Sequence, residues 1–322
     1  MPTLTTTAKN IPVKKKKTGN SLITNFKKRK VLYYMAIPGL IFYLVFRYAP
    51  MFGIIVAFQN YNPYEGISAF WTSQFVGFHW FQILFSQPEF WQLLRNTLLI
   101  SLYFIIFGFP APIILALLLN EVRNAHFKRI SQTITYIPHF LSWALVGGII
   151  IQMLSPDHGL VNNILGLFGF KPNYFLSNPH YFRGIVVGSG IWKEVGWDSI
   201  IYLAAIAGID PTLYEAAIID GANRWKQVIY VTIPSILPVI TILLILSFGR
   251  VMETGFDEIY MFISPYTQKV GDVFSTYSLR VGIRNAQYSY ITALGLFQNV
   301  VNLIILLICN KISKTVSENS LW

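Results

Sequence analysis

Side chains that could bind a polar solute are concentrated in one apolar stretch of the sequence, residues 184–209. Glu194 and Asp198 are four residues apart, so a helix would present both carboxylates on one face. Lys193 adds a hydrogen-bond donor beside them, and Trp197 adds an aromatic ring. Carboxylates accept hydrogen bonds from sugar hydroxyls, and aromatic rings stack against the CH faces of sugar rings. The stretch therefore has the chemistry of a surface along which a polar, hydroxyl-bearing solute could pass.

Three further ionisable residues lie in or beside apolar stretches. Arg250 and Glu253 are three residues apart, which would allow an internal ion pair on a helix, and Arg47 interrupts the first apolar stretch. A charge inside a bilayer is costly and usually faces a protein partner or a water-filled path. All of these residues are candidates for the substrate pathway. The alternatives are that they pair with one another or with a second subunit, or that the outer ones extend toward the membrane interface.

The sequence contains no motif for nucleotide hydrolysis or nucleophilic catalysis. No G-x-x-x-x-G-K-[ST] run occurs to hold phosphates, and no G-x-S-x-G elbow occurs. Asp157 and His158 stand beside Pro156 and Gly159, as in a turn rather than a catalytic pair. A single cysteine, Cys309, excludes an internal disulfide and a cysteine-based zinc site, and the five histidines show no paired metal-ligand spacing. We therefore expect that this chain is not an enzyme and binds no metal or cofactor.

The elements that must position these residues are long apolar helices. Of the 322 residues, 54% are hydrophobic and only 12% are charged, and the mean hydropathy is +0.50. A soluble domain usually carries about twice that charged fraction, and intrinsic disorder is excluded for the same reason. A helix that crosses a bilayer needs about 20 mostly apolar residues, whereas the strands of a barrel are short and alternating. Six stretches meet the requirement for a helix: residues 31–58, 96–120, 133–154, 184–209, 233–248 and 288–310.

The basic residues predict the orientation of these helices. The net charge is +11, and 16 of the 25 Lys and Arg residues lie in the four segments that share one side if there are six spans. Such segments are typically cytoplasmic, so both termini are predicted to be cytoplasmic, and the charge does not indicate a nucleic-acid partner. Residues 31–46 lack a signal-peptide cleavage pattern, so we expect the first helix to be retained. The prediction is an all-α polytopic membrane protein with a basic cytoplasmic tail (1–30), a six-helix transmembrane domain (31–311) and a cytoplasmic C-terminal tail (312–322).

One predicted cytoplasmic connection, residues 210–238, has the pattern of a folded element rather than a loop. Asp210 is a suitable N-cap, and Pro211 fits the first turn of a helix predicted over residues 212–219. Gly221 would end that helix, since glycine readily adopts the positive φ that follows a helix end. A second apolar face then leads into the fifth span. On spacing alone, this helix–turn–helix could be an interfacial segment lying among lipid head groups.

The same connection resembles the EAA loop of ABC importer permeases. That signature is Glu-Ala-Ala, a glycine a few residues on, and a hydrophobic residue followed by proline near the next span. The matching residues here are Glu215-Ala216-Ala217, Asp220-Gly221-Ala222 and Ile233-Pro234. Small departures are Val228, where sugar permeases often carry Phe, and Ile233, where Leu is common. The resemblance implies docking into a cleft of a cytoplasmic ATPase, with Glu215 in polar contact and the small residues allowing close packing.

The resemblance covers nearly the whole chain and is to the polysaccharide-type branch of the maltose permease superfamily. The matching segments are YAPMFG (48–53), AFQ (57–59), GFPAP (108–112), LALLLNE (115–121), PHFLSW (138–143) and SPDHGLVNN (155–163). That branch includes lipoprotein-associated sugar permeases and one permease subunit of an alginate importer. The alginate-importer subunit is the member that we expect, although the branch also serves other oligosaccharides.

The resemblance implies a type I ABC importer permease of the bacterial inner membrane. The implied partners are a second homologous permease subunit, two copies of a cytoplasmic ATPase that hold ATP and Mg, an external sugar-binding protein, and membrane lipid. The implied function is to form half of a translocation pathway for an oligosaccharide or polysaccharide. One alternative is an ion-coupled secondary transporter of a small polar solute, although the internal repeats typical of that class are not evident. A membrane-embedded enzyme is disfavoured by the missing catalytic residues.

Overall fold

The computed structural model describes residues 30–317, and the chain divides into two compact units, residues 1–53 and 54–322. Apart from Lys30, the predicted N-terminal tail lies outside the described residues, as do residues 318–322 of the predicted C-terminal tail. The first unit is helical throughout its described part: α2 (Lys30–Tyr43), the π-helical turn η1 (Leu44–Tyr48), α3 (Ala49–Met51) and the start of the 3-10 segment η2 (Phe52–Phe58).

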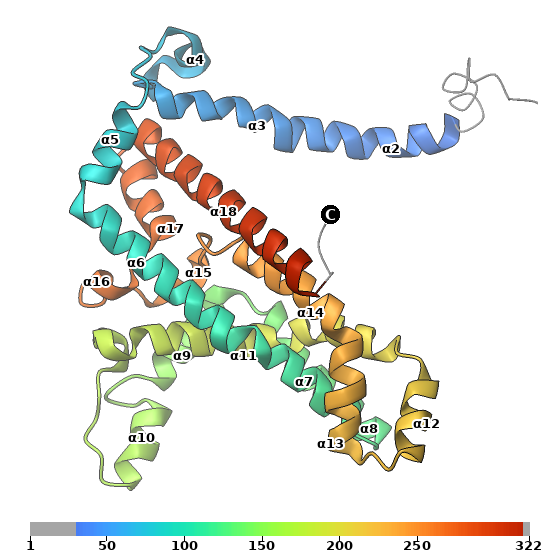
Figure 1. Ribbon diagram of the computed structural model, residues 1–322. Helices are drawn as coiled ribbons and strands as arrows, with labels where there is room; N and C mark the ends of the chain where they lie inside the picture. Colours follow the sequence, from blue (N-terminus) through green and yellow to red (C-terminus); the bar gives the residue numbers. More distant parts are fainter. Residues whose placement is uncertain (1–29, 318–322) are drawn as a thin grey trace, which may run out of the picture. The chain divides into compact units, whose positions relative to one another are not determined.

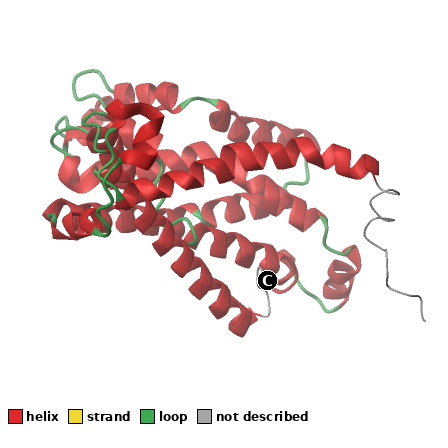
Figure 2. Ribbon diagram, turned by 90° about the horizontal axis from the view of Figure 1, so that it is seen from above, coloured by secondary structure: helices red, strands yellow, loops and turns green. Residues whose placement is uncertain are grey.

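The second unit is built from helices and the loops between them (Figure 2). Within residues 30–317, strand-like pairing is limited to an isolated bridge between Gln59 and Phe75. In chain order, the elements are η3 (Pro63–Ser68), α4 (Ala69–Thr72), α5 (His79–Ser86), α6 (Pro88–Tyr103), η4 (Phe104–Gly108), α7 (Pro110–Glu121), α8 (Ala125–Tyr136), η5 (Ile137–Phe140), α9 (Trp143–Met153), α10 (Leu160–Leu167), η6 (Phe175–Ser177), α11 (Pro179–Ala207), α12 (Pro211–Ile219), α13 (Arg224–Gln227), η7 (Val228–Thr232), α14 (Ile233–Phe248), α15 (Phe256–Phe262), α16 (Gln268–Gly271), α17 (Phe274–Tyr277), η8 (Ser278–Ile283) and α18 (Tyr288–Ser317).

Several of these helices are long and apolar enough to cross a membrane. Four do so as continuous helices: Lys30–Phe58, Pro88–Glu121, Arg224–Phe248 and Tyr288–Thr315. Two bent pairs, Ala125–Phe140 with Trp143–Met153 and Pro179–Ala207 with Pro211–Ile219, raise the number to six if each pair is one span. The prediction of an all-helical polytopic protein is therefore confirmed, with four to six candidate spans.

The third predicted span, residues 133–154, is not the uninterrupted helix that the sequence suggested. The chain bends by 102° between the helices on either side of Leu141 and Ser142. Pro138 lacks a backbone N–H, and Leu141 adopts an extended conformation that ends the first helix. Ser142 then starts α9, because its side chain accepts a hydrogen bond from the backbone N–H of Leu145 at 3.3 Å. The break is thus a capped corner between two helices.

Three of the prolines that lie inside long helices follow a π turn. Pro50, Pro110 and Pro234 each follow a residue whose N–H donates to the carbonyl five positions earlier, in the pairs Ala49–Leu44, Phe109–Phe104 and Ile233–Val228. In a regular α-helix the proline ring would clash with the carbonyl four positions before it, and these wider π turns change the position of that carbonyl. The fifth span, predicted to begin at residue 233, therefore begins earlier, at Arg224.

The apolar core consists of three clusters distributed along the second unit. One joins α5, α6 and α18 around Phe90, Phe274 and Leu294, and a second joins α6, α11 and α15 around Ile100, Phe182 and Ile259. The third joins α7, α11 and α14 through Ala116, Tyr202, Ile206 and Ile236. Because α11 belongs to two of the clusters, it is the element against which much of the unit packs. Figure 1 shows α16 and α12 at opposite ends of this unit.

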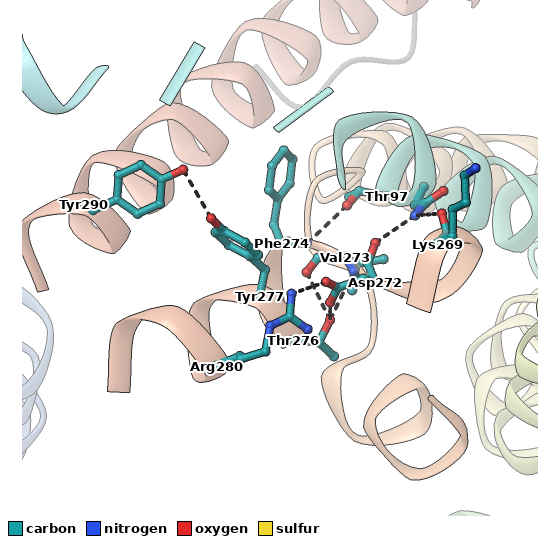
Figure 3. A network of polar contacts seen from close by, with 10 residues as sticks. Thr97, Lys269, Asp272, Val273, Phe274, Thr276, Tyr277, Arg280 and Tyr290 are labelled. Carbon is teal, nitrogen blue, oxygen red and sulfur yellow. Dashed lines mark hydrogen bonds and ion pairs between the residues drawn. The ribbon is translucent and has the colours of Figure 1, made fainter. Parts of the chain in front are cut away.

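A buried polar network holds the segment before α18 against α6 and α11, and Figure 3 shows the part of it around Asp272, Thr276 and Arg280. The Asn96 amide donates to the carbonyl of Asp272 at 3.0 Å and accepts from Arg183 at 2.9 Å. The Asp272 carboxylate accepts from the Thr276 hydroxyl at 2.7 Å and pairs with Arg280. Because an unpaired buried polar group is costly, these mutual bonds strongly favour one arrangement of the segment. The sequence did not predict this arrangement.

Close packing of α11 against α8 depends on Gly196. A Cβ at this position would overlap the backbone of Thr135, whereas a Cβ at Gly188 of the same helix would meet no atom within 4 Å. We expect Gly196→Ala to destabilise the protein by roughly 1–3 kcal/mol, because the two backbones must separate. We expect Gly188→Ala to behave like wild type. Thermal unfolding of the purified protein in detergent measures both, and equal effects at the two positions would contradict the close approach.

Candidate functional site

A cavity of about 880 Å³ is lined by residues of α6, η4, α7, α11, α14 and the segment that follows α14. The wall includes five of the seven residues that the sequence suggested for a substrate pathway: Glu194, Trp197, Asp198, Arg250 and Glu253. The first three share a face of α11 because of their helical spacing. Arg250 and Glu253 come from the turn after α14. The structure brings these side chains to one cavity, and their part in transport stays a prediction.

The charges on the cavity wall are unbalanced, with four carboxylates and one guanidinium. Glu258 of α15 is the carboxylate that the sequence did not suggest, since no apolar run or motif marks its short helix, and it is only 8% exposed. The expected ion pair between Arg250 and Glu253 does not form, and Glu253 accepts a hydrogen bond from Asn302 at 3.2 Å instead. Within residues 30–317, no group of three or more His, Cys, Asp or Glu could hold a metal ion. The wall therefore mainly offers hydrogen-bond acceptors.

Two of the suggested pathway residues, Lys193 and Arg47, do not line this cavity. Lys193 is only 5% exposed, and its ammonium donates to Glu194 at 2.7 Å and to the backbone carbonyl of His139 at 2.9 Å. A buried ammonium is stable only when it is paired, so Lys193 holds α11 to η5 from behind the wall. Arg47 lies in η1 of the first unit, which is described separately from the cavity.

His139 is a polar residue of the site that sequence reasoning missed. Its Nδ1 lies 2.5 Å from a carboxylate oxygen of Glu194, and its ring is parallel to the indole of Trp197, with centroids 4.3 Å apart. A lone histidine in an apolar stretch has no spacing pattern that would reveal such partners. The only available indication was its position in the PHFLSW segment. The capped corner after η5 brings it against α11.

The connection after α11 folds as the predicted helix–turn–helix. Asp210 caps α12, because its side chain accepts a hydrogen bond from the backbone N–H of Thr212 at 2.9 Å, and Pro211 occupies the first turn. The same hydrogen bond lowers the pKa of the Asp210 carboxyl, since it favours the ionised form. The local sequence therefore determines where α12 begins, and a 70° bend separates it from α11.

The turn that ends α12 depends on Gly221. This glycine has a φ of +75°, and its N–H donates to the carbonyl of Ile218 at 3.0 Å. The N–H of Ala222 donates to the carbonyl of Ala217 at 2.8 Å, which completes the paired hydrogen bonds of a Schellman motif. Asp220 is the C-cap residue between them. The predicted end of the helix at this glycine is confirmed, and its physical cause is the positive φ that these two hydrogen bonds require.

The hairpin formed by residues 210–227 is braced on one side and exposed on the other. Tyr214 is hydrogen-bonded to Thr232 at 2.9 Å, and Arg224 forms an ion pair with Glu121 of α7 at 2.9 Å. The suggested docking residues Glu215, Ala216, Asp220, Gly221 and Pro234 are exposed, and Ala217 and Ala222 are half-buried. Figure 1 shows α12 and α13 side by side at one end of the second unit.

Comparisons with known proteins agree with this architecture. Residues 108–318 match the family of binding-protein-dependent transport system inner membrane components. Protein LplB of Bacillus subtilis is 43% identical over 94% of this chain and 95% of its own length. The polygalacturonan/rhamnogalacturonan transport system permease protein YteP of Bacillus subtilis is 42% identical over 96% of this chain and 95% of its own length.

A solved structure has the same fold. A chain in the crystal structure of a bacterial alginate ABC transporter, in complex with an alginate pentasaccharide-bound periplasmic protein, is 41% identical to this one. The TM-score is 0.85, and the match covers 93% of this chain and 99% of that chain. The family consists of membrane components of binding-protein-dependent transport systems. It therefore excludes the secondary transporter and the membrane-embedded enzyme that the sequence had left as alternatives, and the chain is a permease rather than an ATPase. This chain therefore belongs to the binding-protein-dependent ABC transporter permeases, as a multi-pass inner-membrane component.

Proposed function

We propose that this chain is one permease subunit of an ATP-driven oligosaccharide importer, and that its hairpin transmits movement from a cytoplasmic ATPase. The proposal rests on one observation: the hairpin is bonded to neighbouring helices on one side, and its other side is exposed. Its bonds to Thr232 and Glu121 tie it to η7 and α7, while no residue of α12 is buried. A rigid element of this kind passes a displacement on to the helices that hold it.

The exposed surface of the hairpin suits a protein partner. Its apolar side chains include Ile219, which is 85% exposed, and Trp225, which is 74% exposed. Exposed apolar patches bordered by polar residues mark interaction sites, and Glu215 would add a polar contact. The small residues Ala216 and Gly221 would allow the partner to approach closely. Because α12 follows directly after α11, movement of the hairpin would reach the wall of the cavity.

The proposed substrate is an oligosaccharide or polysaccharide, with alginate as the leading candidate. One relative is named for polygalacturonan and rhamnogalacturonan, and the solved transporter imports the acidic polysaccharide alginate. The wall described here carries four carboxylates and one guanidinium. An acidic sugar requires complementary basic groups, and this wall supplies only one. Most of the basic groups that bind the sugar would therefore come from the second permease subunit.

The proposed assembly contains a second homologous permease subunit, two copies of a cytoplasmic ATPase and an external sugar-binding protein. The related alginate transporter, whose structure includes a sugar-loaded periplasmic protein, supports the last of these partners. ATP and Mg would be held by the ATPase subunits, and this chain would bind neither.

We further propose that both termini and the hairpin are cytoplasmic. Sixteen of the 25 basic residues lie in segments that share one side if there are six spans. The corresponding organisation is a cytoplasmic tail (1–30), a transmembrane domain (31–311) with its coupling loop (210–238), and a second tail (312–322).

Substitution of Glu215 tests the coupling role. We expect Glu215→Ala to lower ATP-driven sugar uptake by about tenfold, because the loss of one polar contact at a protein interface commonly costs that much. The measurement is uptake of labelled alginate oligosaccharide into proteoliposomes that contain the assembled transporter. Asp157→Ala is the matched control, because it also removes an exposed carboxylate but at a position outside the hairpin. Unchanged uptake by Glu215→Ala and Gly221→Pro would show that the hairpin does not couple.

Labelling of introduced cysteines tests the orientation. Cys309 is the only cysteine, so Cys309→Ser provides a background without a thiol. In that background we expect Tyr64→Cys to react with a membrane-impermeant maleimide added to intact cells, because Tyr64 is 91% exposed in a predicted external loop. Thr212→Cys, in α12, should react only after the membrane is permeabilised. The reverse pattern would invert the proposed topology.

A further inference from the structure

We propose that a second groove, between η4 and the first half of α11, binds one anionic phospholipid. Its phosphate would lie against Arg183, and an acyl chain would lie along Gly184 and Gly188. The groove has a volume of about 810 Å³, which is within the usual range of small-molecule sites. The inference goes beyond sugar transport, because it assigns a ligand that comes from the bilayer.

The groove is separate from the cavity to which the sugar pathway is assigned. Ile191 is the only residue that lines both. Phe107 of η4 and Gly188 of α11 line the groove, whereas Phe104 and Gly190 of the same two elements line the cavity. The two hollows therefore lie on different faces of η4 and α11, and an occupant of the groove would not block the cavity.

Arg183 gives the groove a positive charge that the described part of the chain does not neutralise. Its Nε donates to the carbonyl of Val270 at 3.2 Å, and one terminal nitrogen donates to the Asn96 amide oxygen at 2.9 Å. A guanidinium has five N–H donors, so donors remain. Within residues 30–317 no carboxylate forms an ion pair with Arg183, and Arg95 acts on it as a like charge. Phosphate oxygens are suitable partners, since they accept paired hydrogen bonds from a guanidinium.

The position of Arg183 along α11 suits a lipid head group. The helix has 29 residues and is therefore roughly 43 Å long, whereas the hydrocarbon of a bilayer is about 30 Å thick. If α11 crosses the membrane, both of its ends reach the head-group regions. Arg183 lies in the second turn after Pro179, at the end opposite the hairpin. Its guanidinium is thus near the level of lipid phosphates.

The rest of the groove is an open apolar strip. A Cβ at Gly184 or Gly188 would meet no atom within 4 Å, whereas a Cβ at Gly190 would lie 2.7 Å from the ring of Phe104. Phe107 borders the strip and is 59% exposed. An acyl chain fits such a surface, and it begins at the phosphate level where Arg183 lies.

A helix of the second permease subunit is the other possible occupant of a strip of small residues. Such a helix would have to carry a carboxylate to Arg183, and an ionised side chain inside a bilayer is costly. A phospholipid has no such cost, because its phosphate already lies at the head-group level and its chains in the hydrocarbon. The unpaired guanidinium therefore favours the lipid.

The experiment measures lipid binding to the detergent-purified transporter by native mass spectrometry. The probes are phosphatidylglycerol and phosphatidylcholine with the same acyl chains. We expect wild type to bind phosphatidylglycerol about tenfold more tightly, because the choline cation of the other lipid would stand near Arg183 and Arg95. Arg183→Gln should remove this preference, and Arg183→Lys, which keeps a cation, should retain most of it.

A second variant tests the apolar strip without removing any polar contact. We expect Gly188→Leu to weaken binding of both lipids about tenfold, since its side chain would displace about two CH₂ groups of the acyl chain. Gly148→Leu is the matched control, because Gly148 is also an exposed helical glycine with open space around it but does not line the groove. Arg129→Gln, at an exposed position in α8, is the control for charge. Both controls should bind lipid like wild type.

Three results would overturn the inference. The first is an undiminished preference for phosphatidylglycerol in a folded Arg183→Gln complex, and the second is wild-type lipid binding by Gly188→Leu. The third is loss of the second permease subunit from Gly188→Leu but not from Gly148→Leu, which would show that a partner helix occupies the groove. If Arg183→Gln does not fold without its bonds to Asn96 and Val270, the comparison of Gly188→Leu with Gly148→Leu decides the question.

Discussion

Hydrocarbon offers no hydrogen-bond partner to the peptide backbone, so each long apolar segment of this chain must satisfy its own backbone groups. The helical architecture follows from this constraint, and so do the local devices where a regular helix is not possible. At Pro50, Pro110 and Pro234 a wide turn carries the helix past the proline. At Ser142 and Asn178 a side chain accepts from the first turn of a new helix. Each of these five irregularities is therefore accompanied by a hydrogen bond.

The same constraint acts on side chains that leave water. Asn96 and Asp272 are buried, and their mutual bonds fix the segment before α18 against two long helices. Lys193 is buried as well, and its pairing with Glu194 joins α11 to the corner that carries His139. These buried polar groups are costly to leave unpaired, so their contacts specify one packing arrangement rather than merely adding stability.

α11 connects the two regions to which function is assigned. One face lines the cavity, and the C-terminal end leads through Asp210 into α12. Its other contacts place it in two of the three core clusters, so it is packed against neighbouring helices along much of its length. If an ATPase displaces the hairpin as proposed, the cavity wall is displaced with it, which is the mechanical requirement of alternating access.

Local features of the sequence were sufficient to predict the helices and the hairpin. Hydropathy over about 20 residues reports membrane helices because their backbone bonding is internal to each segment. The start and end of α12 were equally predictable, since Asp210 and Gly221 act within a few residues of themselves. The spacing of Glu194 and Asp198 likewise predicted a shared face, because helical geometry is local.

Only the tertiary structure decided what lies opposite those residues. The expected pair of Arg250 and Glu253 fails because α14 ends at Phe248, so helical spacing no longer applies to them. Pro138 precedes a corner while Pro110 lies in a continuous helix, a difference that no single residue type encodes. His139 and Glu258 reach the cavity region from separate helices. Their positions depend on how helices pack, and packing is set by contacts between residues distant in sequence, which a local pattern does not contain.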